Sequence, residues 1–318
     1  MEMRNIPGCG LALPVVGIGC NNFGGRSGLE ETRAVVHKAL DVGITFFDTA
    51  DVYPSTNKGQ SETLLGQVLG ARRKDVVIAS KFGIRMDGPA GASRRYIVSA
   101  VEASLRRLGT DWIDLYQLHR PDPQTPLAET LRALDDLVRA GKVRYVGCSN
   151  FAAWQVADAH WIAKELGIDG FVSCQNEYSL LRREMDHELI PALTAFGKGL
   201  LPYFPLAGGM LTGKYKPQEE APAATRFAKT KVFADMFMTE RNWTIVQQLE
   251  AFCAERGRTM VELAFSWLAT RPALWSIIAG ASTPAQVEQN AAACEWRLAA
   301  DDLAEIDRIT APAPLGSH

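Results

Sequence analysis

The sequence predicts a (β/α)8 TIM barrel, and three observations support this fold class. Eight short apolar segments alternate with amphipathic segments of helical period. Short continuous apolar runs are typical of parallel strands that are buried on both faces. No G-x-G-x-x-G follows the first of these segments, which argues against the alternative, an open doubly wound sheet. Eight βα units therefore favour a closed barrel, with residues 1–318 as a single domain.

The predicted strands, in chain order, are residues 15–20, 44–48, 75–81, 112–119, 143–149, 171–176, 200–204 and 275–280. Residues 1–14 precede them. A turn at Pro7-Gly8 or at Cys9-Gly10 would make a small N-terminal hairpin that plugs the floor of the barrel.

Helix ends are marked by residues with capping preferences. Ser93 and Gly109 bound a helix over 94–108, in which apolar residues recur at helical spacing. Similar signals mark three other helices. Thr125-Pro126 precedes a stripe of leucines that ends before Gly141. Thr259 and Glu262 form a T-x-x-E capping box, and a similar pattern recurs at Thr283, Pro284 and Gln286.

Two long segments are predicted to be loops at the active rim of the barrel. Residues 83–92 carry three glycines, and residues 213–238 are rich in Pro, Lys and Ala with weak periodicity before a helix that Thr239 would cap. Long loops in a compact domain usually serve as lids or binding loops.

Composition excludes several classes of function. Net charge is −2 and the isoelectric point is about 6.2, so no basic surface for nucleic acid is indicated. The N-terminus lacks the apolar segment of a signal peptide, and no run approaches the roughly 20 apolar residues that span a bilayer. The six cysteines are widely spread, without C-x-x-C pairs or metal-ligand clusters. We expect reduced thiols and a cytoplasmic location.

Four polar residues stand at the ends of consecutive predicted strands. Asp48, Lys81 and His119 end the second, third and fourth strands, and Tyr53 follows Asp48 by five residues. In a parallel barrel these ends meet on one rim. An acid, a phenol, an amine and an imidazole brought together indicate proton transfer to a carbonyl oxygen.

The chemistry of the four groups suggests a role for each. Tyr53 would be the proton donor, Lys81 would lower the pKa of its phenol, and Asp48 would hold Lys81 in place. His119 would orient the carbonyl from a neutral ring. Taken singly, each residue has an ordinary alternative, as a turn or cap, packed surface, a solvated charge or a packing group. Their joint occurrence at neighbouring strand ends favours the catalytic interpretation.

Several motifs that include these residues resemble the aldo-keto reductase superfamily, over about residues 10–308. They are F-D-T-A-D-V-Y (47–53), I-A-S-K-F-G (78–83), S-L-R-R-L-G-T-D-W-I-D-L-Y-Q-L-H-R-P-D (104–122), G-K-V-R-Y-V-G-C-S-N-F (141–151), L-T-G-K-Y (211–215) and G-A-S-T-P-A-Q-V-E-Q-N (280–290). The pattern is similar to the branch that contains potassium-channel β subunits and bacterial NADPH-dependent reductases. The family tetrad falls on Asp48, Tyr53, Lys81 and His119.

The resemblance also implies a set of residues that bind NADP(H) across the rim. Ser149, Asn150 and Gln175 match contacts to the nicotinamide carboxamide, and Tyr203 matches the aromatic residue that stacks on the ring. Ser149 and Asn150 could instead cap the helix that follows, and Tyr203 could be core. The remaining matches are Leu206, Gly208 and Lys214 in the 206–214 loop for the pyrophosphate, Ser282 and Gln286 for the 2′-phosphate, and Asn290 for adenine. Lys214 could equally be solvated and Gln286 purely a capping residue.

Two positions depart from other family branches. Phe204 stands where some branches have a phosphate-binding serine, and Gly280 where they have a lysine. A preference for NADPH over NADH is nevertheless expected. Phe23, Phe82 and Phe227 would either line the substrate mouth or belong to the core.

The resemblance implies an NADP(H)-dependent oxidoreductase that reversibly reduces an aldehyde or ketone to an alcohol, with a small-molecule substrate and no metal. The alternative it leaves open is a cofactor-binding, redox-sensing regulatory subunit with little turnover. A barrel hydrolase or lyase would need a nucleophile or metal that the motifs do not supply. The substrate and the oligomeric state stay open, because specificity resides in loops that one sequence does not decode.

Overall fold

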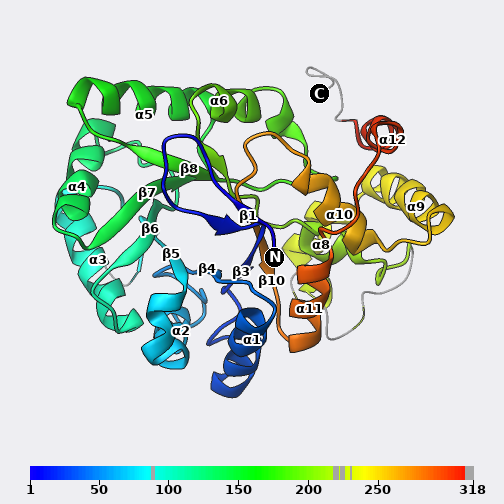
Figure 1. The fold of residues 1–318 in the computed structure, drawn as a ribbon, viewed down its shortest axis with the longest axis horizontal. Coiled ribbons are helices and arrows are strands. Elements are labelled where there is room, and N and C mark those ends of the chain that lie inside the picture. Colours follow the sequence, from blue (N-terminus) through cyan, green and yellow to red (C-terminus); the bar gives the residue numbers. More distant parts are fainter. Residues whose placement is uncertain (87–89, 218–221, 223–225, 230, 312–318) are drawn as a thin grey trace.

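Eight parallel strands form the barrel in the computed structural model, which describes residues 1–86, 90–217, 222, 226–229 and 231–311 (Figure 1). Spatial neighbours run in the order β10-β3-β4-β5-β6-β7-β8-β9, so the strands follow chain order around the barrel. Their bounds are β3 Val16–Gly19, β4 Phe46–Asp48, β5 Val77–Phe82, β6 Ile113–Leu118, β7 Val143–Ser149, β8 Phe171–Gln175, β9 Gly199–Leu200 and β10 Ile277–Gly280.

The sheet closes through backbone hydrogen bonds between its first and last strands in space. Leu200 N donates to Ala273 O at 2.7 Å, Trp275 N donates to Leu200 O at 2.9 Å, and Ile278 N donates to Pro202 O at 2.9 Å. The (β/α)8 barrel and its eight strands are thereby confirmed. β9 is shorter than the predicted 200–204, because Pro202 has no N–H to donate and Phe204 adopts a φ of +54° that leaves the extended conformation.

Helices surround the strands on the outside of the barrel (Figure 1). They are α1 Leu29–Asp41, α2 Gln60–Leu69, α3 Arg94–Leu108, α4 Leu127–Arg139, α5 Ala153–Leu166, α6 Leu189–Ala195, α9 Glu240–Glu255, α10 Met260–Ala269, α11 Pro284–Ala292 and α12 Ala300–Thr310. One large hydrophobic cluster fills the layer between them and the sheet, and it includes Phe23, Phe82 and Phe227. These three phenylalanines are therefore core residues and do not line a substrate mouth, because each is 3 % exposed or less.

The predicted caps largely hold. Ser93 caps α3, Gly109 ends it in the left-handed conformation, and Thr239 caps α9. Thr259 and Glu262 form the expected capping box at α10. Thr283 caps α11, but the Gln286 side chain accepts from Ser282 N at 2.8 Å, one residue before the position expected for a capping box.

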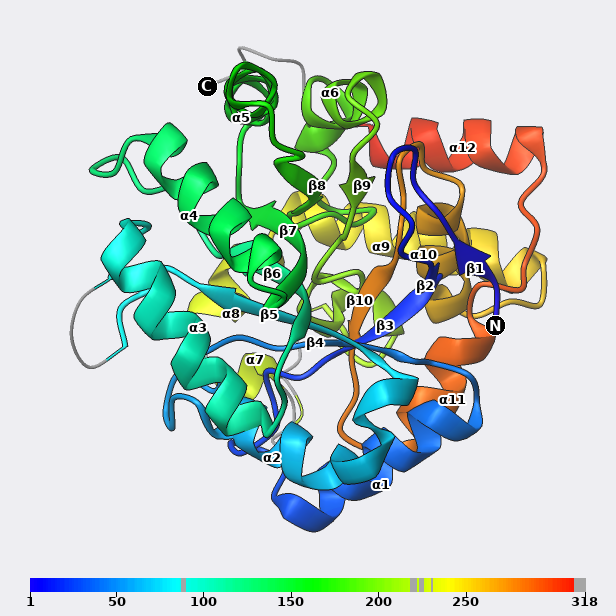
Figure 2. The ribbon, with the colours of Figure 1, turned by 60° about the vertical axis from the view of Figure 1, so that its left-hand side comes forward.

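An antiparallel hairpin, β1 Met3–Arg4 with β2 Leu13–Pro14, precedes the barrel as predicted and lies across one end of it in Figures 1 and 2. Of the two predicted turns the chain uses Pro7-Gly8, since Gly8 has a φ of +72° and Cys9 N donates to Ile6 O. The indole of Trp275 donates to Arg4 O at 3.1 Å and ties the hairpin to the barrel.

A separate lumen cluster fills the inside of the barrel above the hairpin. Its buried members are Ile6, Leu13, Phe46, Ala79, Leu115, Val172, Leu201, Trp275 and Ile278. Gly17 leaves room for one of them, because a Cβ at this position would stand 2.5 Å from the Phe46 ring. Strand residues two positions beyond a lumen residue share its face, which directs the polar residues at the strand ends into the same lumen.

The two predicted long loops are described in part, since residues 87–89, 218–221, 223–225 and 230 lie outside the described residues. Residues 213–238 contain two short helices, α7 Arg226–Lys229 and α8 Lys231–Phe237, where only loop was predicted. Phe227 anchors this segment, stacking on Tyr215 with ring centroids 4.5 Å apart. Such tertiary stacking stabilises helices that are too short to show a clear apolar period.

Candidate active site

The parallel register brings the predicted tetrad together at the carboxyl ends of β4, β5 and β6. Asp48 is the last residue of β4, and Lys81 is two residues beyond the lumen residue Ala79 on β5. His119 follows β6, where its backbone N–H donates to Phe82 O at 2.8 Å and extends the pairing by one residue. Three strand ends thus deliver their polar side chains to one place, as alternation along each strand requires.

Asp48 is the centre of a buried hydrogen-bond network. Lys81 Nζ donates to Asp48 Oδ2 at 2.6 Å and to Thr49 O at 2.9 Å. Asp48 Oδ1 accepts from Gln117 Nε2 at 3.2 Å and from Gln175 Nε2 at 2.8 Å. Both oxygens of the Asp48 carboxyl group thus have hydrogen-bond donors, and these bonds hold the three donor side chains in fixed positions.

Gln117 is a site residue that the sequence analysis missed. It lies two residues beyond the lumen residue Leu115 and pairs with Lys81 in the β5–β6 ladder. The signal was present in W-I-D-L-Y-Q-L-H, where a lone amide occupies the lumen face of an apolar strand. Its buried Oε1 has no hydrogen-bond partner among the described residues.

Tyr53 lies between the amine and the imidazole. Lys81 Nζ is 5.0 Å from the centroid of the Tyr53 ring, and the His119 ring meets it edge-on with centroids 5.6 Å apart. Burial raises the pKa of Tyr53, and the positive charge of Lys81 opposes this rise only in part. The expectation of a net lowered pKa is therefore wrong, although Lys81 acts in the expected direction. Tyr53 keeps its proton at neutral pH.

His119 is neutral at neutral pH, as expected. Burial, together with the charges of Lys81 and Arg120, lowers its pKa from 6.5 to about 2. The side chain is 8 % exposed, and Nδ1 is buried without a hydrogen-bond partner in the described part of the chain. For Lys81, burial acts to lower the pKa, but the Asp48 carboxylate together with Tyr53 and Cys20 reverses this effect, and the pKa is raised. The site combines a neutral imidazole, a neutral phenol and a charged amine.

The residues predicted for the nicotinamide form a chain of hydrogen bonds beside the tetrad. Ser149 Oγ donates to Gln175 O at 2.7 Å, and Asn150 Nδ2 donates to His119 O at 3.0 Å. The Tyr203 hydroxyl donates to Asn150 Oδ1 at 2.8 Å. Neither Ser149 nor Asn150 caps α5, whose N-cap is Ala152, so the capping alternative is wrong.

Glycines shape the predicted pyrophosphate loop, part of which is the 3-10 segment η3 Ala207–Thr212. The Leu206 carbonyl accepts from Gly209 N at 2.8 Å, which folds the loop back on itself. Gly208 and Gly209 have φ values of +68° and +106°. A Cβ on Gly208 would stand 2.8 Å from Phe227, and one on Gly209 would stand 2.8 Å from Lys214 Nζ. Glycine is therefore required here by the packing of the loop itself.

The predicted adenosine-phosphate residues gather where β10 meets α11. Ser282 Oγ accepts from Asn22 Nδ2 at 3.2 Å, and Asn22 is a second contact that the sequence analysis missed. Asn290 is buried, and its Nδ2 donates to Gly280 O at 3.5 Å. Among the described residues, no atom lies within 4 Å of a Cβ built on Gly280, so the space beside this residue is open.

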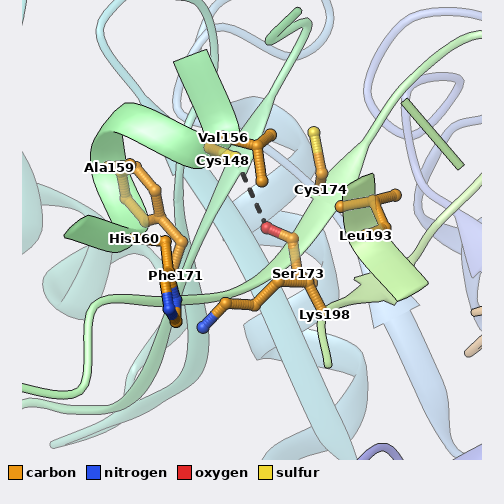
Figure 3. A pocket seen from close by; sticks show the side chains of 9 residues that line it. All are labelled: Cys148, Val156, Ala159, His160, Phe171, Ser173, Cys174, Leu193 and Lys198. Atoms are coloured by element: carbon orange, nitrogen blue, oxygen red, sulfur yellow. Dashed lines mark hydrogen bonds between the residues drawn. The ribbon is translucent and has the colours of Figure 1, made fainter. Parts of the chain in front are cut away.

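Two cavities lie apart from the tetrad. The smaller, of about 10 Å³, lies among β7, β8, α5 and α6, where Figure 3 shows Cys148 and Cys174 on neighbouring strands with Lys198 and His160. The larger, of about 260 Å³, is lined by residues that include Leu118, Phe151 and Trp154. No described group of three or more His, Cys, Asp or Glu side chains could hold a metal ion.

Comparison with known proteins agrees with this geometry. Residues 15–311 match the model of the "Aldo/keto reductase family". The chain is 34 % identical over 299 residues to a "Probable voltage-gated potassium channel subunit beta" of Oryza sativa subsp. japonica, covering 91 % of this chain and 90 % of the relative. It is 33 % identical over 326 residues to "L-glyceraldehyde 3-phosphate reductase" of Escherichia coli O157:H7, covering 99 % and 94 %.

A third relative is an uncharacterized oxidoreductase of Bacillus subtilis (strain 168), 35 % identical over 327 residues and covering 99 % of this chain and 98 % of the relative. None of the described helices has the length and apolar character needed to span a bilayer. With the family model extending over nearly the whole barrel, this chain belongs to the aldo/keto reductase family.

Proposed function

We propose that this protein is an NADP(H)-dependent oxidoreductase that reversibly reduces a small aldehyde or ketone to an alcohol. The observation that carries the proposal is the placement of Tyr53 between Lys81 and His119, with Lys81 bound to a buried Asp48. Phenol, amine and imidazole would then surround one carbonyl oxygen. Reductase-named relatives over nearly the full chain length support the same reaction class.

Tyr53 is the general acid in reduction and the general base in oxidation. Its raised pKa keeps the hydroxyl protonated, so a proton is available when negative charge develops on the carbonyl oxygen. The Lys81 ammonium stabilises the phenolate that remains, and Asp48 keeps that ammonium charged and in place. Neutral His119 orients the oxygen without competing for the proton.

The residues present fit NADP(H). When bound, the reduced nicotinamide supplies the hydride that the carbonyl carbon accepts. Amide and hydroxyl groups of Ser149, Asn150 and Gln175, together with Tyr203, suit a carboxamide and its ring. The remaining contacts are proposed for Leu206, Gly208 and Lys214 at the pyrophosphate, and for Ser282, Gln286 and Asn290 at the adenosine end.

The open space at Gly280, beside the start of α11, supports a phosphate group there, because helix N-termini favour anions. We therefore propose a preference for NADPH over NADH. Comparing kcat/KM for the two nucleotides in wild type and in Gln286→Ala tests this. The ratio should fall in the variant.

The decisive experiment is Tyr53→Phe, assayed for NADPH consumption with a small aldehyde. We expect kcat to fall about a hundredfold or more, the usual scale for general acid catalysis. Cofactor binding, followed by fluorescence, should persist. Tyr145→Phe is the matched control, because Tyr145 packs against the lumen cluster near the hairpin at Gly10. Wild-type turnover in Tyr53→Phe would refute the proposal.

The relative named as a potassium channel subunit favours one alternative, a cofactor-binding redox sensor with little turnover. Slow turnover with every aldehyde and ketone in a panel, together with very slow release of bound nucleotide, would support that alternative.

We also propose a single catalytic domain that works in the cytoplasm on small molecules, without nucleic acid or membrane partners. Its net charge of −2 and its six free cysteines support this setting.

A further inference from the structure

Most charged groups around the tetrad have an opposite charge beside them. Asp48 is bound to Lys81, and Glu177, just beyond β8, lies 3.7 Å from Arg182. Burial raises the pKa of Glu177, and the charge of Arg182 opposes this rise. Asp48 and Glu177 therefore each have a basic side chain beside them.

Arg120 differs from these groups. It immediately follows His119 at the end of β6, its side chain is exposed, and no described residue forms a hydrogen bond or ion pair with it. Asn150 Nδ2 donates to His119 O at 3.0 Å, which holds the peptide before Arg120 at the site. The charge of Arg120 acts on two site residues, since it helps to lower the pKa of His119 and opposes the rise in the pKa of Tyr203. Arg120 thus lies beside the proposed carbonyl site with its guanidinium available.

The nearest acid in the sequence does not neutralise Arg120. Asp122 accepts hydrogen bonds from Ala92 N at 2.8 Å, Gln124 N at 3.0 Å and Thr125 Oγ1 at 2.7 Å. These bonds turn its carboxylate toward the start of α4 and the end of the 83–92 loop. No acidic side chain among the described residues forms an ion pair with Arg120 at this end of the barrel.

We propose that Arg120 recognises an anionic group on the substrate, and that the preferred substrates are carbonyl compounds bearing a carboxylate or a phosphate. This inference rests on the proposed reductase function and specifies its substrate class. A guanidinium offers paired N–H donors that match carboxylate and phosphate oxygens. The proposed anionic group would bind at Arg120, and the carbonyl would bind at His119, the preceding residue.

The kinetic test compares pairs of related aldehydes in which one member carries an anionic group and the other does not. One pair is 4-formylbenzoate and its methyl ester, and the other is glyceraldehyde 3-phosphate and glyceraldehyde. For wild type and Arg120→Met, the ratio of kcat/KM for the charged to the neutral member of each pair is measured. We expect the ratio to fall about tenfold or more in the variant, through KM, as for loss of a charge-assisted hydrogen bond. The two pairs show whether carboxylate or phosphate is preferred.

Two further variants make the result specific. Arg120→Lys keeps the charge without the planar fork, so it should restore part of the ratio. Arg132→Met removes an exposed arginine from α4 and changes the net charge by the same amount as Arg120→Met. It should leave the ratio unchanged, because a change of net charge alone does not remove the proposed contact to the substrate. An equal loss in Arg120→Met and Arg132→Met would overturn the assignment.

A binding measurement separates this inference from the reductase proposal. Calorimetry with 4-formylbenzoate and its ester, on protein saturated with NADP+, needs no turnover. Tighter binding of the carboxylate that disappears in Arg120→Met supports the inference even where no aldehyde is reduced. Equal binding of acid and ester by wild type overturns it, whatever the turnover. Loss of NADPH affinity in Arg120→Met, with the substrate ratio unchanged, would instead assign Arg120 to the cofactor and also overturn it.

Discussion

The two halves of the proposed site are built in different ways. The tetrad half, at the ends of β4, β5 and β6, is buried, and Asp48 accepts hydrogen bonds from Lys81, Gln117 and Gln175 within it. The nucleotide half, along the 206–214 loop and the start of α11, consists of positive-φ glycines and partly exposed polar groups. In the first half the strand ladder fixes positions, and in the second a folded loop does so.

This difference predicts different responses to mutation. Polar groups in the tetrad half contribute both to stability and to the proposed chemistry, because removing one leaves a buried partner unsatisfied. Groups in the nucleotide half face the proposed ligand, so their loss should weaken binding with little effect on folding. Three experiments test this division.

The largest effect is expected for Lys81→Met. Asp48 would lose its charged partner while remaining buried, so the free energy of unfolding should fall by about 3–5 kcal/mol and turnover should be lost. Chemical denaturation measures the first effect and NADPH consumption the second. The double variant Asp48→Asn/Lys81→Met removes both charges and should regain much of the stability but no activity. Equal stability of the single and double variants would contradict the coupling.

A smaller effect, dependent on pH, is expected at Asp51, three residues past β4. Its carboxyl group is 1 % exposed, and neither oxygen has a hydrogen-bond partner in the described part of the chain. Burial, with a contribution from the charge of Glu62, raises its pKa from 3.8 to about 8. The folded state thus binds a proton that the unfolded state releases between these pH values, and this contribution to stability falls as pH rises from about 4 to 8.

Asp51→Asn should therefore flatten the dependence of unfolding free energy on pH, by an amount on the order of a few kcal/mol between pH 5 and pH 8. Urea denaturation at both pH values measures this change. Asp111→Asn, at an exposed position, is the matched control. A slope in Asp51→Asn as steep as in wild type would show that Asp51 is ionised in the folded protein.

The smallest effect is expected in the nucleotide half, for Gly209→Ala. The new methyl group would enter a φ of +106° and meet Lys214 Nζ, so stability should fall by roughly 1 kcal/mol. Affinity for NADPH, measured by fluorescence titration, should fall several-fold. The control is Gly257→Ala, because Gly257 has a φ of +63° and no atom of the described residues lies within 4 Å of a Cβ built there. This variant should show the same kind of backbone strain with unchanged affinity for NADPH. An equal loss of NADPH affinity in Gly257→Ala would contradict the proposed difference between the two halves of the site.

Features that depend on local pattern could be predicted. Apolar runs located the strands, Ser93 and Gly109 bounded α3, and the Pro7-Gly8 turn belongs to the hairpin. Strand ends in a parallel barrel share one rim, so the meeting of Asp48, Lys81 and His119 followed from the fold class alone.

Features that depend on neighbours distant in sequence could not be predicted from the sequence alone. Gln117 binds Asp48 across 69 residues and Asn22 binds Ser282 across 260 residues, and nothing near either residue indicates its partner. The helices α7 and α8 depend on aromatic anchors such as Phe227 rather than on a strong period of their own.

By itself, the sequence determined the barrel, the order of its strands and the types of polar group at their ends, because alternation, capping and strand length are local properties of the chain. Only the tertiary structure decided the protonation of those groups. Burial keeps the Tyr53 phenol neutral against the opposing charge of Lys81, and burial together with the charges of Lys81 and Arg120 keeps the His119 ring neutral. Burial in turn depends on the whole packed barrel.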